Sequence, residues 1–219
     1  MELQNDKVKY YLHNLIHRYP ALKVVKKEIM DAYIAMGKCY LSNGKLLVAG
    51  NGGSAADAEH IVGELGKGFC VDRKIPCSIQ KKILEVDKEA GEFLNGILQK
   101  PLPAIALNTL SLSSAFANDV DPVGVFAQLV LSYGEEGDVF LALSTSGNST
   151  NILYASIVAK AMGLKTIILT GKSGGILAKY ADISVKVPEE EVHLIQEYHL
   201  PIYHCWCMML EKYFFNLNT

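Results

Sequence analysis

The segment Lys45-Leu46-Leu47-Val48-Ala49-Gly50-Asn51-Gly52-Gly53-Ser54 joins an apolar run to a glycine-rich turn, and a helical pattern follows over 54–67. The apolar run predicts a buried strand, and the three glycines allow positive φ and close backbone approach. The serine is a residue type that caps helices. A strand, turn and helix in this order leave unpaired amide groups and a positive helix end facing outward, which favours an anion site. The glycine spacing matches neither the dinucleotide pattern nor the Walker pattern.

His60 and Glu64 stand four residues apart on this predicted helix. One helical face therefore presents an imidazole beside a carboxylate. Pairs at this spacing are usually solvated helix contacts, so the functional interpretation depends on the glycine turn that precedes them. The combination indicates acid–base or metal chemistry next to a phosphate or sugar site.

The composition limits the class of protein. The chain has 219 residues, half of them hydrophobic, which fits one sizeable α/β domain or a core with appendages, and we expect a single domain over 1–219. Its 21 basic and 23 acidic residues give a net charge of −2, so we expect neither nucleic acid nor an anionic membrane as partner. No apolar run is long enough to span a bilayer, and the first residues lack the apolar core of a secretory signal. The five scattered cysteines favour reduced, buried thiols and a cytoplasmic location.

Strand-like and helix-like segments alternate along the chain. Residues 2–18 and 21–42 predict two helices within an N-terminal segment 1–43, broken at Tyr19-Pro20. The predicted strands are 46–49, 103–107, 139–143, 166–169 and 183–187, and the later helices are 54–67, 122–133, 149–163, 174–180 and about 193–215. Uniformly apolar strands between helices predict a parallel sheet buried on both faces. The last helix is apolar over much of its surface, which predicts burial in the domain or in a subunit interface.

Residues 70–102 interrupt this alternation. They predict a helix or helical hairpin inserted before the second strand. A spacer, a subunit contact and a lid over the site all remain open for this insertion.

A second polar loop, residues 144–150, follows the strand 139–143 and precedes another helix. Its clustered hydroxyl groups and the helix amino terminus can donate several hydrogen bonds to one phosphate. Taken alone, the cluster is more often an ordinary turn with a serine cap. Two such loops at the carboxyl ends of strands favour a ligand site, because ligands of open parallel sheets bind at that edge.

Four motifs in order carry a resemblance to sugar isomerase (SIS) domains, specifically to the bacterial phosphoheptose isomerases, also called sedoheptulose 7-phosphate isomerases. The motifs are the loop 50–54 followed by Asp57, His60 and Glu64; Asn118-Asp119; the loop 144–149; and Gln196-Glu197 with His204. Each motif is weak alone, and their joint order and spacing are specific. The resemblance runs from about residue 20 to the end, apart from 70–102.

The resemblance implies a flavodoxin-like SIS fold with a five-stranded parallel sheet, and a homotetramer with active sites between subunits. It implies that sedoheptulose 7-phosphate is converted to D-glycero-D-manno-heptose 7-phosphate by proton transfer through an enediol or enediolate. It also implies a zinc ion and no organic cofactor.

The same resemblance assigns roles to individual residues. It implies that Glu64 and His204 transfer the protons, and that zinc binds His60, Glu64, Gln196 and His204. The implied substrate-binding and phosphate-binding residues are Asn51, Gly52, Gly53, Ser54, Asp119, Ser144, Thr145, Ser146, Ser149 and Gln196. Helix geometry adds that Gln196 and His204 lie roughly 12 Å apart along one axis, so one ion reaches both only if their side chains converge or a neighbouring subunit takes part.

Two positions depart from the family pattern. Gly68 stands where an arginine is common, and His193 stands where an aspartate is common. Together with the longer insertion, these departures leave the fold expectation untouched and the exact substrate open, so an isomerase of another ketose phosphate, with a pentose or hexose chain, is one alternative. A non-catalytic SIS module that binds sugar phosphates or other proteins is an alternative of a different class.

Overall fold

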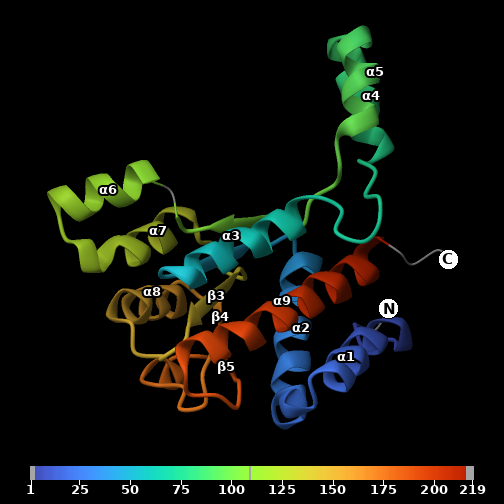
Figure 1. The fold of residues 1–219 in the computed structure, drawn as a ribbon. Helices are drawn as coiled ribbons and strands as arrows, with labels where there is room; N and C mark the ends of the chain where they lie inside the picture. Colours follow the sequence, from blue (N-terminus) through green and yellow to red (C-terminus); the bar gives the residue numbers. More distant parts are fainter. Residues whose placement is uncertain (1–2, 109, 216–219) are drawn as a thin grey trace.

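The computed structural model describes residues 3–108 and 110–215. In this part of the chain, five parallel strands form one sheet in the order β2-β1-β3-β4-β5 (Figure 1). The strands are β1 (Leu46–Gly50), β2 (Ala104–Ala106), β3 (Val139–Ser144), β4 (Lys165–Thr170) and β5 (Ile183–Lys186). This is the flavodoxin-like order. The predicted α/β fold class is therefore confirmed, and each predicted strand coincides with an observed one.

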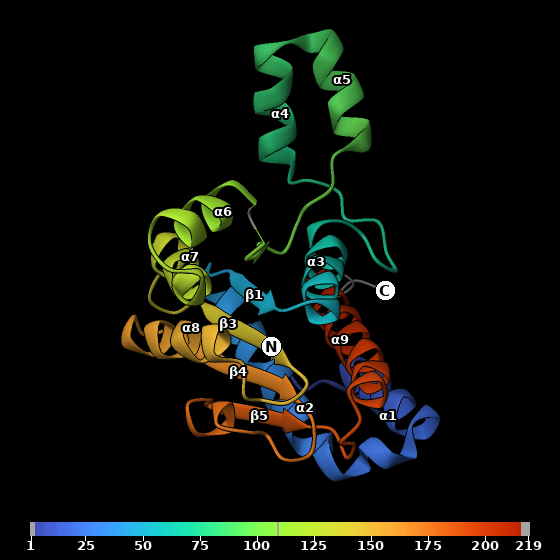
Figure 2. The same cartoon turned by 60° about the vertical axis from the view of Figure 1, so that its left-hand side comes forward.

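The sheet is the middle layer of three, because alternate strand residues pack on opposite faces. Leu46 and Val48 of β1 belong to one core and Leu47 and Ala49 to the other. The first core includes α1 (Asp6–Arg18), α2 (Lys26–Leu41), α3 (Gly53–Gly66) and α9 (Val192–Phe215), and the second includes α7 (Val125–Tyr133) and α8 (Thr150–Ala161) (Figure 2). All residues of β1 and β3 are buried, as expected for strands covered on both faces.

The last helix, α9, is covered by the chain's own elements. It lies between α3 and the N-terminal helices α1 and α2 (Figure 2). The Trp206 indole Nε1 donates a hydrogen bond to the Ile29 carbonyl of α2 at 2.9 Å. Internal packing therefore accounts for much of its apolar surface, so that surface does not by itself require a partner subunit. None of the described helices is long and apolar enough to cross a membrane.

Three helical predictions need correction, and one helix was not predicted. The predicted helix 122–133 begins as a 3₁₀ turn over Pro122–Gly124 before α7. The predicted second helix begins as a 3₁₀ helix over Pro20–Val25 before α2. The predicted helix 174–180 is reduced to a 3₁₀ turn over Leu177–Lys179. The helix α6 (Leu110–Asp119) was missed, because its serine-rich and alanine-rich sequence has no clear apolar stripe.

The inserted segment forms a helical hairpin, one of the two predicted forms. It consists of α4 (Cys77–Val86) and α5 (Lys88–Ile97), joined at Asp87, whose carboxylate accepts from the Ala90 amide at 2.8 Å. The hairpin projects away from the sheet (Figures 1 and 2). α4 has no buried residue and α5 has one, Gly91. Its role as spacer, subunit contact or lid stays a prediction.

Candidate active site

The first predicted anion loop lies between β1 and α3. Gly52 has φ +55 and is the residue before the first helical turn, with no side chain capping it. Ser54 lies inside α3 and is buried, so the prediction that it caps the helix is wrong. The helix thus starts directly from the glycines, with its amino terminus at the carboxyl edge of the sheet.

The second predicted loop joins β3 to α8 at the same edge. The Ser144 and Ser149 hydroxyl oxygens lie 3.2 Å apart, and the backbone amide of Asn148 donates to the Ser146 hydroxyl oxygen. The Thr145 carbonyl accepts from the Gly171 amide at 3.0 Å, which ties the loop to the end of β4. These contacts hold four hydroxyl-bearing residues of the predicted phosphate site within one short turn.

An asparagine pair joins the two loops. The Asn51 side-chain amide donates to Oδ1 of Asn151 at 3.0 Å, and the Asn151 amide donates to Oδ1 of Asn51 at 3.0 Å. Sequence reasoning missed Asn151, although it lies two residues beyond the motif that ends at Ser149. The pair connects the beginnings of α3 and α8 and so places the two loops side by side.

The predicted proton-transfer residues come together on α3 and α9. His60 Nε2 lies 3.3 Å from Glu64 Oε1 and 3.3 Å from His204 Nε2. The second oxygen of Glu64 pairs with Lys67 Nζ at 3.1 Å, and the carboxylate side chain is 15% exposed. Burial, together with the charge of His60, lowers the pKa of His204, and the charge of Glu64 opposes this shift. His204 is therefore available as a neutral base.

Two further residues support this cluster and lie outside the predicted site. The Tyr203 hydroxyl donates to Asp57 Oδ1 at 3.1 Å and lies 3.1 Å from His60 Nδ1. Burial raises the pKa of Asp57, whereas the hydrogen bond from Tyr203 and the charge of His60 lower it. Burial also raises the pKa of Tyr203, which remains a neutral donor. The only sequence signals were the adjacency of Tyr203 to His204 and the place of Asp57 in the first motif.

Gln196 and Asp119 lie apart from the cluster. A Cβ on Gly53 would come within 2.6 Å of Gln196 Nε2, so this amide packs against the first loop, two turns of α9 before His204. Asp119 is exposed at the end of α6, where its carboxylate accepts from the Asn118 amide at 2.7 Å. Among residues 3–108 and 110–215, no three His, Cys, Asp or Glu side chains have the arrangement of a metal site.

The departure at Gly68 has a steric reason. A Cβ at this position would lie 2.3 Å from the Val71 carbonyl oxygen, so a larger residue would force this backbone to shift. Arg73 lies in the segment that follows Gly68, before α4, and carries the cationic side chain nearest in sequence after it. This side chain is buried, with the residue 1% exposed, and its Nε donates to Glu211 at 2.8 Å. Arg73 therefore anchors the base of the hairpin and does not replace the arginine common in the family. His193, the other departure, is exposed at the start of α9.

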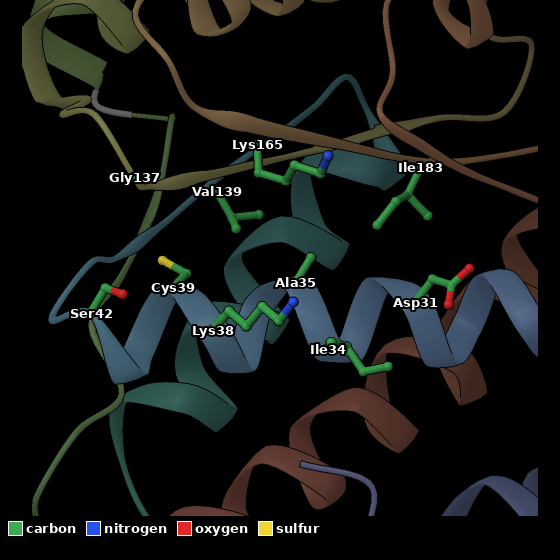
Figure 3. Close-up of a pocket in the computed structure, with 10 residues that line it drawn as sticks. All are labelled: Asp31, Ile34, Ala35, Lys38, Cys39, Ser42, Gly137, Val139, Lys165 and Ile183. Carbon is green, nitrogen blue, oxygen red and sulfur yellow. The ribbon is translucent and has the colours of Figure 1, made fainter. Parts of the chain in front are cut away.

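Cavities lie beside both parts of the candidate site. One of about 280 Å³ is lined by Thr145, Ser146 and Lys172 next to the second loop. Another of about 300 Å³ opens beside His204 and is also lined by Arg18. A third, of about 370 Å³, lies between α2 and the amino ends of the strands, at the opposite edge of the sheet (Figure 3). Only the first two adjoin the predicted site residues.

Comparisons with known proteins agree with this geometry. The SIS domain family model matches residues 107–210. A phosphoheptose isomerase of Halorhodospira halophila is 35% identical over 216 residues, covering 96% of each chain. One of Shewanella loihica is 33% identical over 209 residues, covering 94% of this chain and 93% of the relative. The chain belongs to the phosphoheptose isomerase family.

Solved structures support the family at the level of the fold. The phosphoheptose isomerase from Francisella tularensis is 32% identical with a TM-score of 0.73, and 94% of this chain and 97% of that chain are covered. The one from Neisseria gonorrhoeae is 29% identical with a TM-score of 0.71, with 94% and 98% covered. The family relationship thus spans nearly the whole chain and includes the strands and helices that position the site.

Proposed function

We propose that the protein is an isomerase of sedoheptulose 7-phosphate, which it interconverts with D-glycero-D-manno-heptose 7-phosphate. The observation that carries the proposal is the cluster of Glu64, His60 and His204 on two helices that begin next to paired polar loops. Family membership supports the same reaction, because the relatives are named phosphoheptose isomerases.

The phosphate would bind at the two loops. Hydroxyl groups of Ser144, Thr145, Ser146 and Ser149 would donate to it, assisted by the amino termini of α3 and α8. The sugar or the phosphate would also contact the remaining predicted binding residues, which are Asn51, Gly52, Gly53, Ser54, Asp119 and Gln196. Asn51 is already oriented by its hydrogen bonds with Asn151.

The chemistry moves a proton between C1 and C2 and exchanges the carbonyl with the neighbouring hydroxyl group. Glu64 would take the proton from one carbon and return it to the other. His204 would take a proton from the hydroxyl oxygen and deliver one to the carbonyl oxygen, which its lowered pKa permits at neutral pH. No step requires a hydride acceptor or an organic electron sink.

The side chains of the catalytic cluster are of the types that bind zinc. His60, Glu64 and His204 offer two imidazole nitrogens and a carboxylate, which zinc prefers, although these side chains would have to rearrange to surround an ion. Gln196, two turns away, would complete the set only if the side chains converged further or a neighbouring subunit took part. When bound, zinc would act as a Lewis acid that polarises the sugar oxygens.

We further propose a homotetramer located in the cytoplasm. The loops and the catalytic cluster are separated along α3 and α9, which favours a site completed by a second subunit. All five cysteines are free, which favours a reducing compartment.

The direct test is to incubate the purified protein with five-, six- and seven-carbon ketose phosphates and follow aldose formation. We expect the seven-carbon substrate to give the highest kcat/KM. A preference for a pentose or hexose phosphate would replace the proposed substrate, and no turnover of any of them would exclude the isomerase.

A further inference from the structure

The Tyr203 hydroxyl group lies between one residue of the proposed catalytic cluster and a carboxylate. It is 3.1 Å from Asp57 Oδ1 and 3.1 Å from His60 Nδ1. The Tyr203 side chain is only 1% exposed, so bulk water cannot replace these partners. Asp57 and His60 are three residues apart on α3 and present both groups to the same side chain of α9.

The positions of the protons follow from the number of donors. A carboxylate can only accept, so Tyr203 donates its single hydrogen to Asp57. The tyrosine oxygen is then free only to accept, and the remaining partner, His60 Nδ1, must be the donor. A neutral His60 therefore carries its hydrogen on Nδ1.

The other ring nitrogen of His60 consequently has a free lone pair. This atom, Nε2, faces Glu64 Oε1 and His204 Nε2, each at 3.3 Å. The lone pairs of His60 Nε2 and Glu64 Oε1 so close together favour a proton or cation beside them, and His204 supplies such a proton when its hydrogen is carried on Nε2. The tautomer of His60 decides which ring nitrogen has the lone pair, and the orientation of the ring decides whether that lone pair faces Glu64 and His204.

We propose that Tyr203, supported by Asp57, is a positioning residue that holds His60 in the Nδ1-protonated tautomer and so directs Nε2 toward Glu64 and His204. The catalytic consequence rests on the proposed isomerase function, whereas the tautomer is a property of the protein alone. Residues that hydrogen-bond the second nitrogen of a functional histidine commonly fix its tautomer and orientation in this way.

The first test removes one oxygen atom. Tyr203→Phe keeps the buried ring, and we expect kcat to fall by ~10-fold to ~100-fold with KM nearly unchanged, the scale of such supporting hydrogen bonds. Tyr33→Phe is the matched control, because Tyr33 is equally buried and its hydroxyl donates to the Leu3 carbonyl at 3.0 Å, outside the site. This control should keep the kcat of the unmodified protein.

The second test does not depend on activity. In metal-free, ¹⁵N-histidine-labelled protein at about pH 8, where an ordinary imidazole is neutral, two-bond ¹H–¹⁵N correlations report which nitrogen of His60 is protonated. The resonances are assigned with His60→Gln. We expect protonated Nδ1 in the unmodified protein and a mixture of tautomers in Tyr203→Phe.

The outcomes separate this proposal from the proposed function. An unchanged His60 tautomer in Tyr203→Phe, or Nε2 protonation in the unmodified protein, would overturn it. A protein that isomerises no sugar phosphate but shows the expected tautomers would refute the function alone. If Tyr203→Phe does not fold by circular dichroism, Asp57→Asn provides the same readout, because it weakens the acceptor while keeping the tyrosine.

Discussion

At the scale of single residues, Glu64 has contacts that match its proposed role. Its carboxylate lies 3.3 Å from His60 and 3.1 Å from Lys67, so it is held in place and its charge is balanced. Glu64→Gln keeps the shape and removes the base, and we expect turnover to fall by at least ~100-fold. Glu59→Gln, an exposed change on the same helix, is the control for substitution in α3. Near-normal turnover of a folded Glu64→Gln protein would rule out the assigned role.

His199 predicts a dependence of stability on pH. Its ring is fully buried in α9, and burial lowers its pKa to about 4 from an ordinary value of 6.5. Between these values the unfolded chain binds more protons than the folded one, so stability falls as the pH drops from 6.5 toward 4. The expected loss from this residue approaches about 3 kcal/mol, since one pKa unit corresponds to about 1.4 kcal/mol. Urea unfolding of His199→Gln across this range should show a shallower slope, and an unchanged slope would exclude the contribution.

At the scale of elements, a buried ion pair fastens the base of the hairpin to α9. The side chains of Arg73 and Glu211 are 0% and 2% exposed, and Glu211 also accepts from the Phe69 and Cys70 amides at 2.7 Å. Glu211→Gln leaves a buried charge unpaired, and we expect a loss of about 3 kcal/mol in the free energy of unfolding. The exposed pair of Lys27 and Asp31 is the comparison, and Asp31→Asn should cost less than about 1 kcal/mol. Equal losses in urea titrations would show that burial does not strengthen the first pair.

The loop between β3 and α8 predicts selective loss of phosphate affinity. Ser144→Ala and Ser146→Ala each remove a hydroxyl donor, and a hydrogen bond to a charged group contributes ~1.5–3 kcal/mol. Calorimetric titration should show weaker binding of the phosphorylated ketose, while binding of the same sugar without phosphate stays nearly unchanged. Similar losses of affinity for both ligands would mean that the loop shapes the pocket without binding the phosphate group.

Elements with a strong pattern were predictable and contacts between distant elements were not. The strands β1 and β3 are uniformly apolar and stood out because both of their faces are buried, whereas α6 lacks an apolar stripe. The proximity of His60, Glu64 and His204 was predictable because spacing and motif order place these residues near one another. Tyr203, Asn151 and Arg73 were not, since their roles depend on partners that lie about 100 or more residues away.

At the scale of the whole molecule, the two halves of the proposed site are separated along parallel helices. Glu64 and His204 meet around His60 of the same chain, so these two residues need no partner to come together. Glu64 lies ten residues beyond Ser54 along α3, and His204 lies eight residues beyond Gln196, which packs against the first loop, along α9. These separations correspond to a rise of roughly 12–15 Å. The phosphate loop serving this cluster is therefore expected to come from a neighbouring subunit.

A mixing experiment tests this shared site. Glu64→Gln protein is combined with the double variant Ser144→Ala, Ser146→Ala, and the subunits are exchanged. If the cluster of one subunit works with the loop of another, some mixed interfaces contain both intact parts, and activity rises above the sum of the two parents. Mixing Glu64→Gln with His204→Ala is the control and should restore nothing, because both residues belong to one intrachain cluster. If sedimentation or mass spectrometry shows exchange and the first mixture also gains no activity, each chain carries its complete site.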